Sequence, residues 1–150
     1  MDFLLEKNKK RIVVSNSTLS HKRIKGLDIY FLNLSSEQLE KIVCSYIKGV
    51  GVDCVAQINT ENFLVLIVYK DQIFFFSDRV GSYVWYYTSN VNEFKIALSP
   101  FKFPKKDLEI CQKRIKEFLA FNVVNPPGTV FKHIHALQTA HIGTVSTDSK

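Results

Sequence analysis

The segment at residues 62–77, with the sequence NFLVLIVYKDQIFFFS, decides the fold of this chain. It contains two apolar runs, at 62–69 and 72–77, which are rich in β-branched and aromatic residues. The polar pair Lys70-Asp71 separates them, and two such runs joined by a short polar turn predict a β-hairpin. Successive side chains of a strand point to opposite faces, so apolar residues at almost every position indicate that other layers cover both faces of the hairpin.

A helix is predicted before the hairpin. Ser35 is followed three residues later by Gln38, which is the capping-box pattern found at helix starts. The apolar residues after it recur with helical spacing and form one face, made of Leu39, Ile42, Val43, Tyr46 and Ile47. Gly49 and Gly51 are expected to end this helix, because glycine tolerates the left-handed backbone conformation.

Further elements are predicted on both sides of the hairpin. Strands are expected at 12–14, 27–32, 83–88 and 93–98, and the last two should continue the hairpin as an antiparallel meander. Asp107 is expected to cap a second helix whose inner face is formed by Leu108, Cys111, Ile115, Phe118 and Leu119. Residues 125–128 predict a turn, and short closing strands are expected at 130–131 and 142–145. Helices and antiparallel strands that are segregated in this way indicate an α+β fold.

The composition fits one packed domain in the cytoplasm. The chain has 150 residues, of which 46% are apolar, and this is enough for a sizeable core. Its longest apolar run, at 63–69, is far shorter than the roughly 20 residues that a membrane helix needs, so no membrane is expected as a partner. The basic cluster near the start follows Phe3-Leu4-Leu5, which is the reverse of a secretory signal. The three cysteines are widely spaced and form no C-x-x-C pair, so we expect reduced thiols.

The net charge of +6 is concentrated near the N-terminus. The basic residues there lie among serine, asparagine and threonine, so residues 1–26 are interpreted as a solvated basic segment that precedes a domain at 27–150. Nucleic acid is disfavoured as a partner, because the basic residues are not interleaved with aromatic ones. The aromatic group at 83–87 is interpreted as core or interdomain packing rather than as a platform for base stacking.

The segment after the hairpin resembles the D-R-x-G-x-x-P-L-Y-Y signature of class II glutamine amidotransferase domains of the asparagine synthetase type. The positions that match its charged, glycine and tyrosine residues are Asp78, Arg79, Gly81, Tyr86 and Tyr87. Shorter matches at 34–37, 51–59, 94–99 and 118–141 follow the family's order, so the resemblance covers about the last three quarters of the chain. The alternative that stays open is an ordinary strand-to-strand turn within generic α+β patterning.

The resemblance implies an α+β layered sandwich of the N-terminal-nucleophile type that is shortened at its front. The family begins with a cysteine nucleophile whose free amine acts as its base, and this chain begins Met1-Asp2-Phe3. The aspartate of the family's S-D-T-E motif is replaced by Ser35, and no N-G pair supplies oxyanion donors. We therefore expect no catalytic residue, leave substrate-binding residues unassigned, and interpret the five matching signature residues as structural. Cys44 is expected on or near the buried face of a helix and carries no free amine, so it cannot replace the nucleophile.

By resemblance, the chain is expected to be a non-catalytic, glutaminase-like scaffold for a synthetase domain or partner protein that forms amide bonds with ATP. Asparagine synthesis is the parent reaction, and homodimer contacts are a further role that the resemblance allows. ATP and magnesium are expected in the partner synthetase, since the S-G-G-x-D-S loop that binds pyrophosphate is absent from this chain. A metal site is disfavoured, because His133, His135 and His141 have no acidic residue or cysteine at short spacing. The alternatives are a stand-alone module that binds a peptide or a protein partner edge-on and, less favoured, a nucleic-acid binder.

Overall fold

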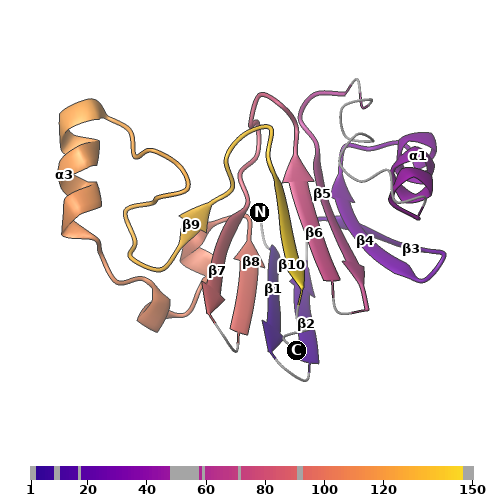
Figure 1. Ribbon diagram of the computed structural model, residues 1–150, viewed down its shortest axis with the longest axis horizontal. Coiled ribbons are helices and arrows are strands. Elements are labelled where there is room, and N and C mark those ends of the chain that lie inside the picture. Colours follow the sequence, from indigo (N-terminus) through magenta and orange to yellow (C-terminus); the bar gives the residue numbers. More distant parts are fainter. Residues whose placement is uncertain are drawn as a thin grey trace. The chain divides into compact units, whose positions relative to one another are not determined.

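A computed structural model of the chain describes residues 3–8, 11–16, 18–47, 58, 60–70, 72–90 and 93–146. Figure 1 shows its elements in sequence colours. The chain divides into two compact units, which are made of Met1–Thr18 with Val84–Gln138 (unit 1) and of Leu19–Tyr83 with Thr139–Lys150 (unit 2). Each unit contains a five-stranded antiparallel sheet, and each has one α-helix among its described residues. The α+β class predicted from the sequence is therefore confirmed.

The sheet of unit 2 has the strand order β10-β6-β5-β4-β3. Its centre is the predicted hairpin, formed by β5 (Leu64–Tyr69) and β6 (Gln72–Ser77) with Val65 opposite Phe76. Strand β4 (Leu27–Leu32) pairs with β5, and the edge strands are β3 (Ser20–Ile24) and β10 (Ile142–Ser146). Side chains on both faces of β5 are buried, as the continuous apolar run predicts.

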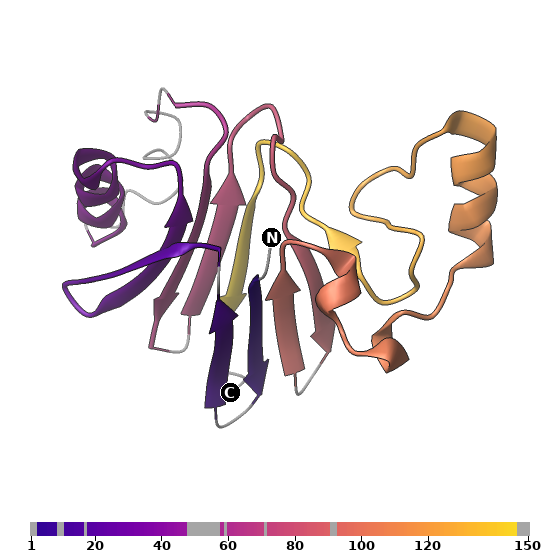
Figure 2. The ribbon, with the colours of Figure 1, turned by 180° about the vertical axis from the view of Figure 1, so that it is seen from behind.

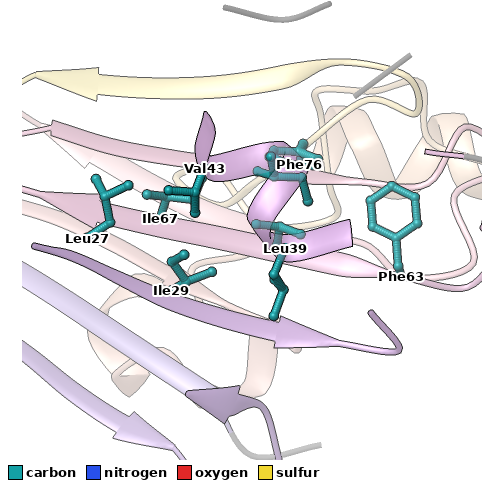
Figure 3. Close-up of a cluster of buried hydrophobic side chains, with 9 residues drawn as sticks. Leu27, Ile29, Leu39, Val43, Phe63, Ile67 and Phe76 are labelled. Carbon is teal, nitrogen blue, oxygen red and sulfur yellow. The ribbon is translucent and has the colours of Figure 1, made fainter. Parts of the chain in front are cut away.

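Helix α1 (Ser36–Ile47) packs on the sheet of unit 2. The predicted capping box is present, because the Ser35 backbone N–H donates to Gln38 Oε1 at 2.8 Å and the Gln38 N–H donates to Ser35 Oγ at 3.3 Å. Figure 3 shows the core that the helix covers, which comprises Leu27, Ile29, Leu39, Ile42, Val43, Phe63, Val65, Ile67 and Phe76. The side chains of Tyr46 and Ile47, and the expected stop at Gly49 and Gly51, lie outside the described residues.

The sheet of unit 1 has the strand order β2-β1-β8-β7-β9. Its strands are β1 (Phe3–Asn8), β2 (Arg11–Asn16), β8 (Glu93–Ala97), β7 (Tyr86–Asn90) and β9 (His135–Ala136). Ala97, Phe103 and Ile134 form a small buried cluster in this unit. Lys95 is also buried, and its ammonium lies 3.0 Å from Glu93 Oε2 and 2.9 Å from Asp107 Oδ2.

Two expectations about the strands are wrong. Residues 1–26 are not a solvated tail, because they supply β1, β2 and β3. Strand β1 pairs with β8 through a register that places Leu4 opposite Ala97, and this partner is far away in sequence. Strands β7 and β8 do not continue the hairpin as a meander, because they belong to the sheet of unit 1. The segment after β6 therefore leads from one sheet to the other.

The second helix also differs from the expectation. Two short 3-10 helices, η1 (Pro100–Lys102) and η2 (Lys105–Asp107), precede it. Asp107 is the last residue of η2, and its carboxylate accepts a hydrogen bond from Lys95 instead of capping an α-helix. Helix α3 (Gln112–Phe121) begins after Cys111, which makes no side-chain cap. None of its residues is buried, so the predicted inner-face residues Ile115, Phe118 and Leu119 do not face a core, whereas Leu108, which precedes the helix, packs on the cluster of Ala97, Phe103 and Ile134. The expected strand at 130–131 is reduced to one bridge between Phe131 and Ile110.

Candidate functional site

A hollow in unit 2 adjoins the turn that carries the D-R-x-G motif. Its volume is about 320 Å³, and it is lined by Ile58, Thr60, Glu61, Phe63, Ser77, Asp78, Arg79 and Val80. These residues meet at the open end of the hairpin, where the chain enters β5 and leaves β6. There the Asp78 backbone N–H donates to the Phe63 carbonyl oxygen at 3.2 Å. The motif and the segment before β5 therefore form one candidate site.

Asp78 holds the turn together. Its side chain is 2% exposed, and Oδ1 accepts hydrogen bonds from the backbone N–H groups of Gly81 at 2.6 Å and Ser82 at 3.0 Å. Gly81 has a φ of 72°, a conformation that glycine adopts without steric cost. A Cβ at this position would also collide with Cγ2 of Thr139. The turn thus requires both the carboxylate and the glycine.

The surroundings of Asp78 favour its charged form. Desolvation by burial raises the pKa of the carboxyl, but hydrogen bonds from Ser82, Gly81 and the Asn62 backbone outweigh it, so the net pKa is lowered. Oδ2 makes no hydrogen bond of ordinary geometry within the described part of the chain. A negative charge is therefore held at the wall of the hollow.

The five signature residues do not lie together. Asp78 and Arg79 line the hollow of unit 2, whereas Tyr86 and Tyr87 belong to β7 in unit 1. Tyr86 packs on the cluster of Ala97, Phe103 and Ile134, and the Tyr87 ring lies 5.5 Å from the ring of His135. Burial raises the pKa of both tyrosines. Trp85, just before them, is fully buried, which fits the packing role expected for the aromatic group.

The described lining of the hollow carries charged and polar groups. Its described lining offers carboxylates, a guanidinium and two hydroxyl groups, which can hold a small polar molecule. Cysteine and histidine are absent from that lining, so these residues supply no thiol with an imidazole base. The pair Gln38 and Thr60 adds a side-chain hydrogen bond beside it.

The cysteines and histidines lie elsewhere. Cys44 was expected on or near the buried face of its helix, but it is exposed on α1. Cys111 lies just before α3 and is half-buried. Both are free thiols, and Cys54 lies outside the described residues. His133 Nε2 lies 3.6 Å from Glu109 Oε2. Within the described ranges, no three side chains of His, Cys, Asp or Glu gather closely enough to hold a metal ion.

A second surface lies on α3, where the sequence predicts an inner face but the structure has exposed apolar side chains. Figures 1 and 2 show α3 standing apart from the sheet of unit 1. Its apolar side chains are Ile115, Phe118, Leu119 and Phe121, which we call the α3 face. Phe118 is 43% exposed, Leu119 77% and Phe121 73%. The helical spacing of these apolar residues predicts an apolar face. Spacing alone does not show whether another part of the chain covers that face.

Polar contacts join α3 to the loop that follows it. Within the helix, Arg114 Nη1 donates to Glu117 Oε2 at 2.6 Å, and Glu117 Oε1 accepts from the Asn125 backbone N–H of that loop at 2.9 Å. The Arg114 guanidinium packs over Gly128, where a Cβ would come within 2.7 Å of it. Asn122 ends the helix in the left-handed conformation. The helix is therefore held against this loop, while Phe118, Leu119 and Phe121 of the α3 face are open to solvent and Ile115 is half-buried.

Comparison with known proteins adds no relative. A scan of the chain against protein-family models finds no match, and a search of curated proteins finds no similar protein. No helix among the described residues is long and apolar enough to cross a membrane. The structure therefore defines an α+β protein with two antiparallel sheets, a hollow at a carboxylate-held turn, and one exposed amphipathic helix.

Proposed function

We propose that this chain is a non-catalytic, glutaminase-like domain of the asparagine synthetase type. In this role it is a scaffold for an ATP-dependent, amide-forming synthetase domain or partner protein. The observation that carries the scaffold role is the exposed α3 face. ATP and magnesium would be bound by the partner.

The turn at Asp78 supports the family part of the proposal. Its carboxylate and Gly81 are used to build the turn, which agrees with a structural role for the D-R-x-G motif. The two antiparallel sheets are compatible with a layered sandwich.

The α3 face supports the scaffold part. Burying an aliphatic or aromatic side chain such as Leu119 or Phe121 contributes about 1.5–3 kcal/mol each, so leaving several of them in water is costly. Contiguous exposed apolar surface on a folded unit is typical of a site where another protein binds. The polar contacts of Arg114 and Glu117 keep this surface presented.

Light scattering on the purified chain tests the scaffold role. Lone scaffold domains associate through their uncovered apolar surface, so we expect weak self-association at about 1 M NaCl, where charge repulsion is screened. Leu119→Lys should abolish it, and Val80→Lys, at an equally exposed position in unit 2, should not. A chain that stays monomeric in high salt at every concentration would contradict the proposal.

A further inference from the structure

We infer that the hollow of unit 2 binds a small organic cation, namely an alkyl ammonium or guanidinium compound, whose charged end contacts the Asp78 carboxylate. This inference goes beyond the proposed scaffold function, which does not involve the hollow. Two independent features carry it: a buried carboxylate oxygen that lacks a partner among the described residues, and a lining that combines further oxygen acceptors with apolar side chains.

The Asp78 carboxylate lies in the wall of the hollow with only one of its oxygens satisfied. Its side chain is 2% exposed, and Oδ1 accepts hydrogen bonds from the backbone N–H groups of Gly81 and Ser82. Both donors are neutral, so they stabilise the negative charge without cancelling it. Oδ2 makes no hydrogen bond of ordinary geometry within the described ranges, and a buried charged acceptor in this state is costly. A cationic N–H group that reached Oδ2 from the hollow would remove this cost.

The rest of the lining suits the two ends of such a ligand. The exposed carboxylate of Glu61 and the hydroxyl groups of Thr60 and Ser77 are further acceptors. An ammonium group has three N–H donors and no acceptor, which matches a wall of oxygen atoms. The apolar side chains that can pack against the ligand's stem are Ile58, Phe63 and Val80.

The charge of the lining favours a cation over an anion. It contains two carboxylates, those of Glu61 and Asp78, and one guanidinium, that of Arg79, so negative charges exceed positive charges by one. Arg79 is exposed whereas Asp78 is buried, and water screens an exposed charge more strongly than a buried one. Hydrogen bonds hold the pKa of Asp78 below its ordinary value, so its negative charge is present at neutral pH.

The volume of the hollow limits the ligand to a small molecule. At about 320 Å³, it lies near the lower end of the range of about 300–1,000 Å³ that is typical of ligand pockets. A ligand of this size has few non-hydrogen atoms and therefore a limited binding free energy. We expect dissociation constants on the order of millimolar for a simple amine.

A heteronuclear NMR titration of the isotope-labelled chain tests the inference, with n-butylamine as the probe. The amine is protonated at neutral pH, and we expect it to cause saturable shifts of the Gly81 and Ser82 amide signals, because these N–H groups bind Asp78. The controls n-butanol and sodium butyrate have stems of similar length without the positive charge. Neither should shift these signals at the same concentration and ionic strength. Equal shifts from n-butanol would overturn the inference, since the stem alone would account for binding.

Removal of single charges separates a site at Asp78 from general attraction to the surface. Asp78→Asn should weaken the binding of n-butylamine about tenfold, because the acceptor loses its charge. Since Asp78 also holds the turn, Glu61→Gln is the second variant and should weaken binding roughly threefold, as is usual for an exposed charge. The control Glu40→Gln removes another exposed carboxylate of unit 2, on α1, and should leave the affinity unchanged. Equal weakening by Glu61→Gln and Glu40→Gln would contradict a site in the hollow.

Two other results would also overturn the inference. Tighter binding of butyrate than of n-butylamine would show that Arg79 makes the hollow an anion site. If n-butylamine in the millimolar range caused no saturable shift at Gly81 or Ser82, the hollow would take no cation. Neither result bears on the scaffold role, which depends on the α3 face and is tested by light scattering.

Discussion

At the scale of single residues, Asp78 is the group on which the candidate site depends. Its buried carboxylate accepts two backbone hydrogen bonds and lines the hollow. We expect Asp78→Asn to lower the free energy of unfolding by about 1–3 kcal/mol, because a charge-assisted bond becomes a neutral one. Urea unfolding followed by circular dichroism would measure this loss. The control Asp28→Asn removes a carboxylate from an exposed pair with His21 and should cost less than about 1 kcal/mol.

The lowered pKa of Asp78 predicts a dependence of stability on pH. A carboxyl with a lower pKa in the folded state contributes stability that is fully present above its unfolded pKa of about 3.9. That contribution is lost as the pH falls through the lower, folded pKa. Wild-type protein should therefore lose more stability below about pH 4 than Asp78→Asn does. Parallel acid-unfolding curves for the two proteins would contradict this assignment.

Gly81 offers a matched pair of substitutions with Gly26. Both have positive φ values, 72° and 83°, but a Cβ at Gly26 meets nothing within 4 Å, whereas one at Gly81 meets Thr139. Gly26→Ala should cost about 1 kcal/mol from backbone strain alone, and Gly81→Ala should cost more. Thermal unfolding of Gly81→Ala with and without Thr139→Ser measures the steric part, because serine removes the methyl group. Equal costs at the two glycines would show that Thr139 does not crowd the turn.

At the scale of elements, the two helices show opposite relations between pattern and burial. In α1 the apolar side chains Leu39, Ile42 and Val43 are buried, and in α3 none is. We expect Leu39→Ala to lower the free energy of unfolding by about 2–5 kcal/mol. Leu119→Ala should change it by less than about 0.5 kcal/mol, as is usual for exposed positions. A large loss from Leu119→Ala in urea unfolding would mean that α3 packs on the chain itself.

The sequence predicts best those elements that depend on interactions between residues close together in the chain. The capping box at Ser35 and Gln38 and the turn between β5 and β6 involve residues near each other in the chain. Strand β2 is predicted by the apolar run at 12–14, but β1 is not, because it pairs with β8 across about ninety residues and the basic side chains nearby indicate a solvated segment. The exposure of α3 could not be predicted, since periodicity shows an apolar face but not its partner.

At the scale of the whole molecule, the candidate site was predicted in part. Asp78, Arg79 and Gly81 share a turn, and the hollow beside it was not foreseen because Thr60, Glu61 and Phe63 reach it only through hairpin pairing. Tyr86 and Tyr87, adjacent to this turn in sequence, lie in the other unit. The ten-residue signature therefore includes the point at which the chain leaves one sheet and enters the other.

We propose above that this chain is a glutaminase-like scaffold without glutaminase activity. Isothermal titration of the purified protein with glutamine, with ammonia measured in the same sample, tests it most directly. We predict no ammonia release, whether or not heat shows that glutamine binds. Ammonia release that survives removal of contaminating enzymes would contradict the claim. Cys44, Cys54 and Cys111 would then have to be replaced one at a time to find the nucleophile.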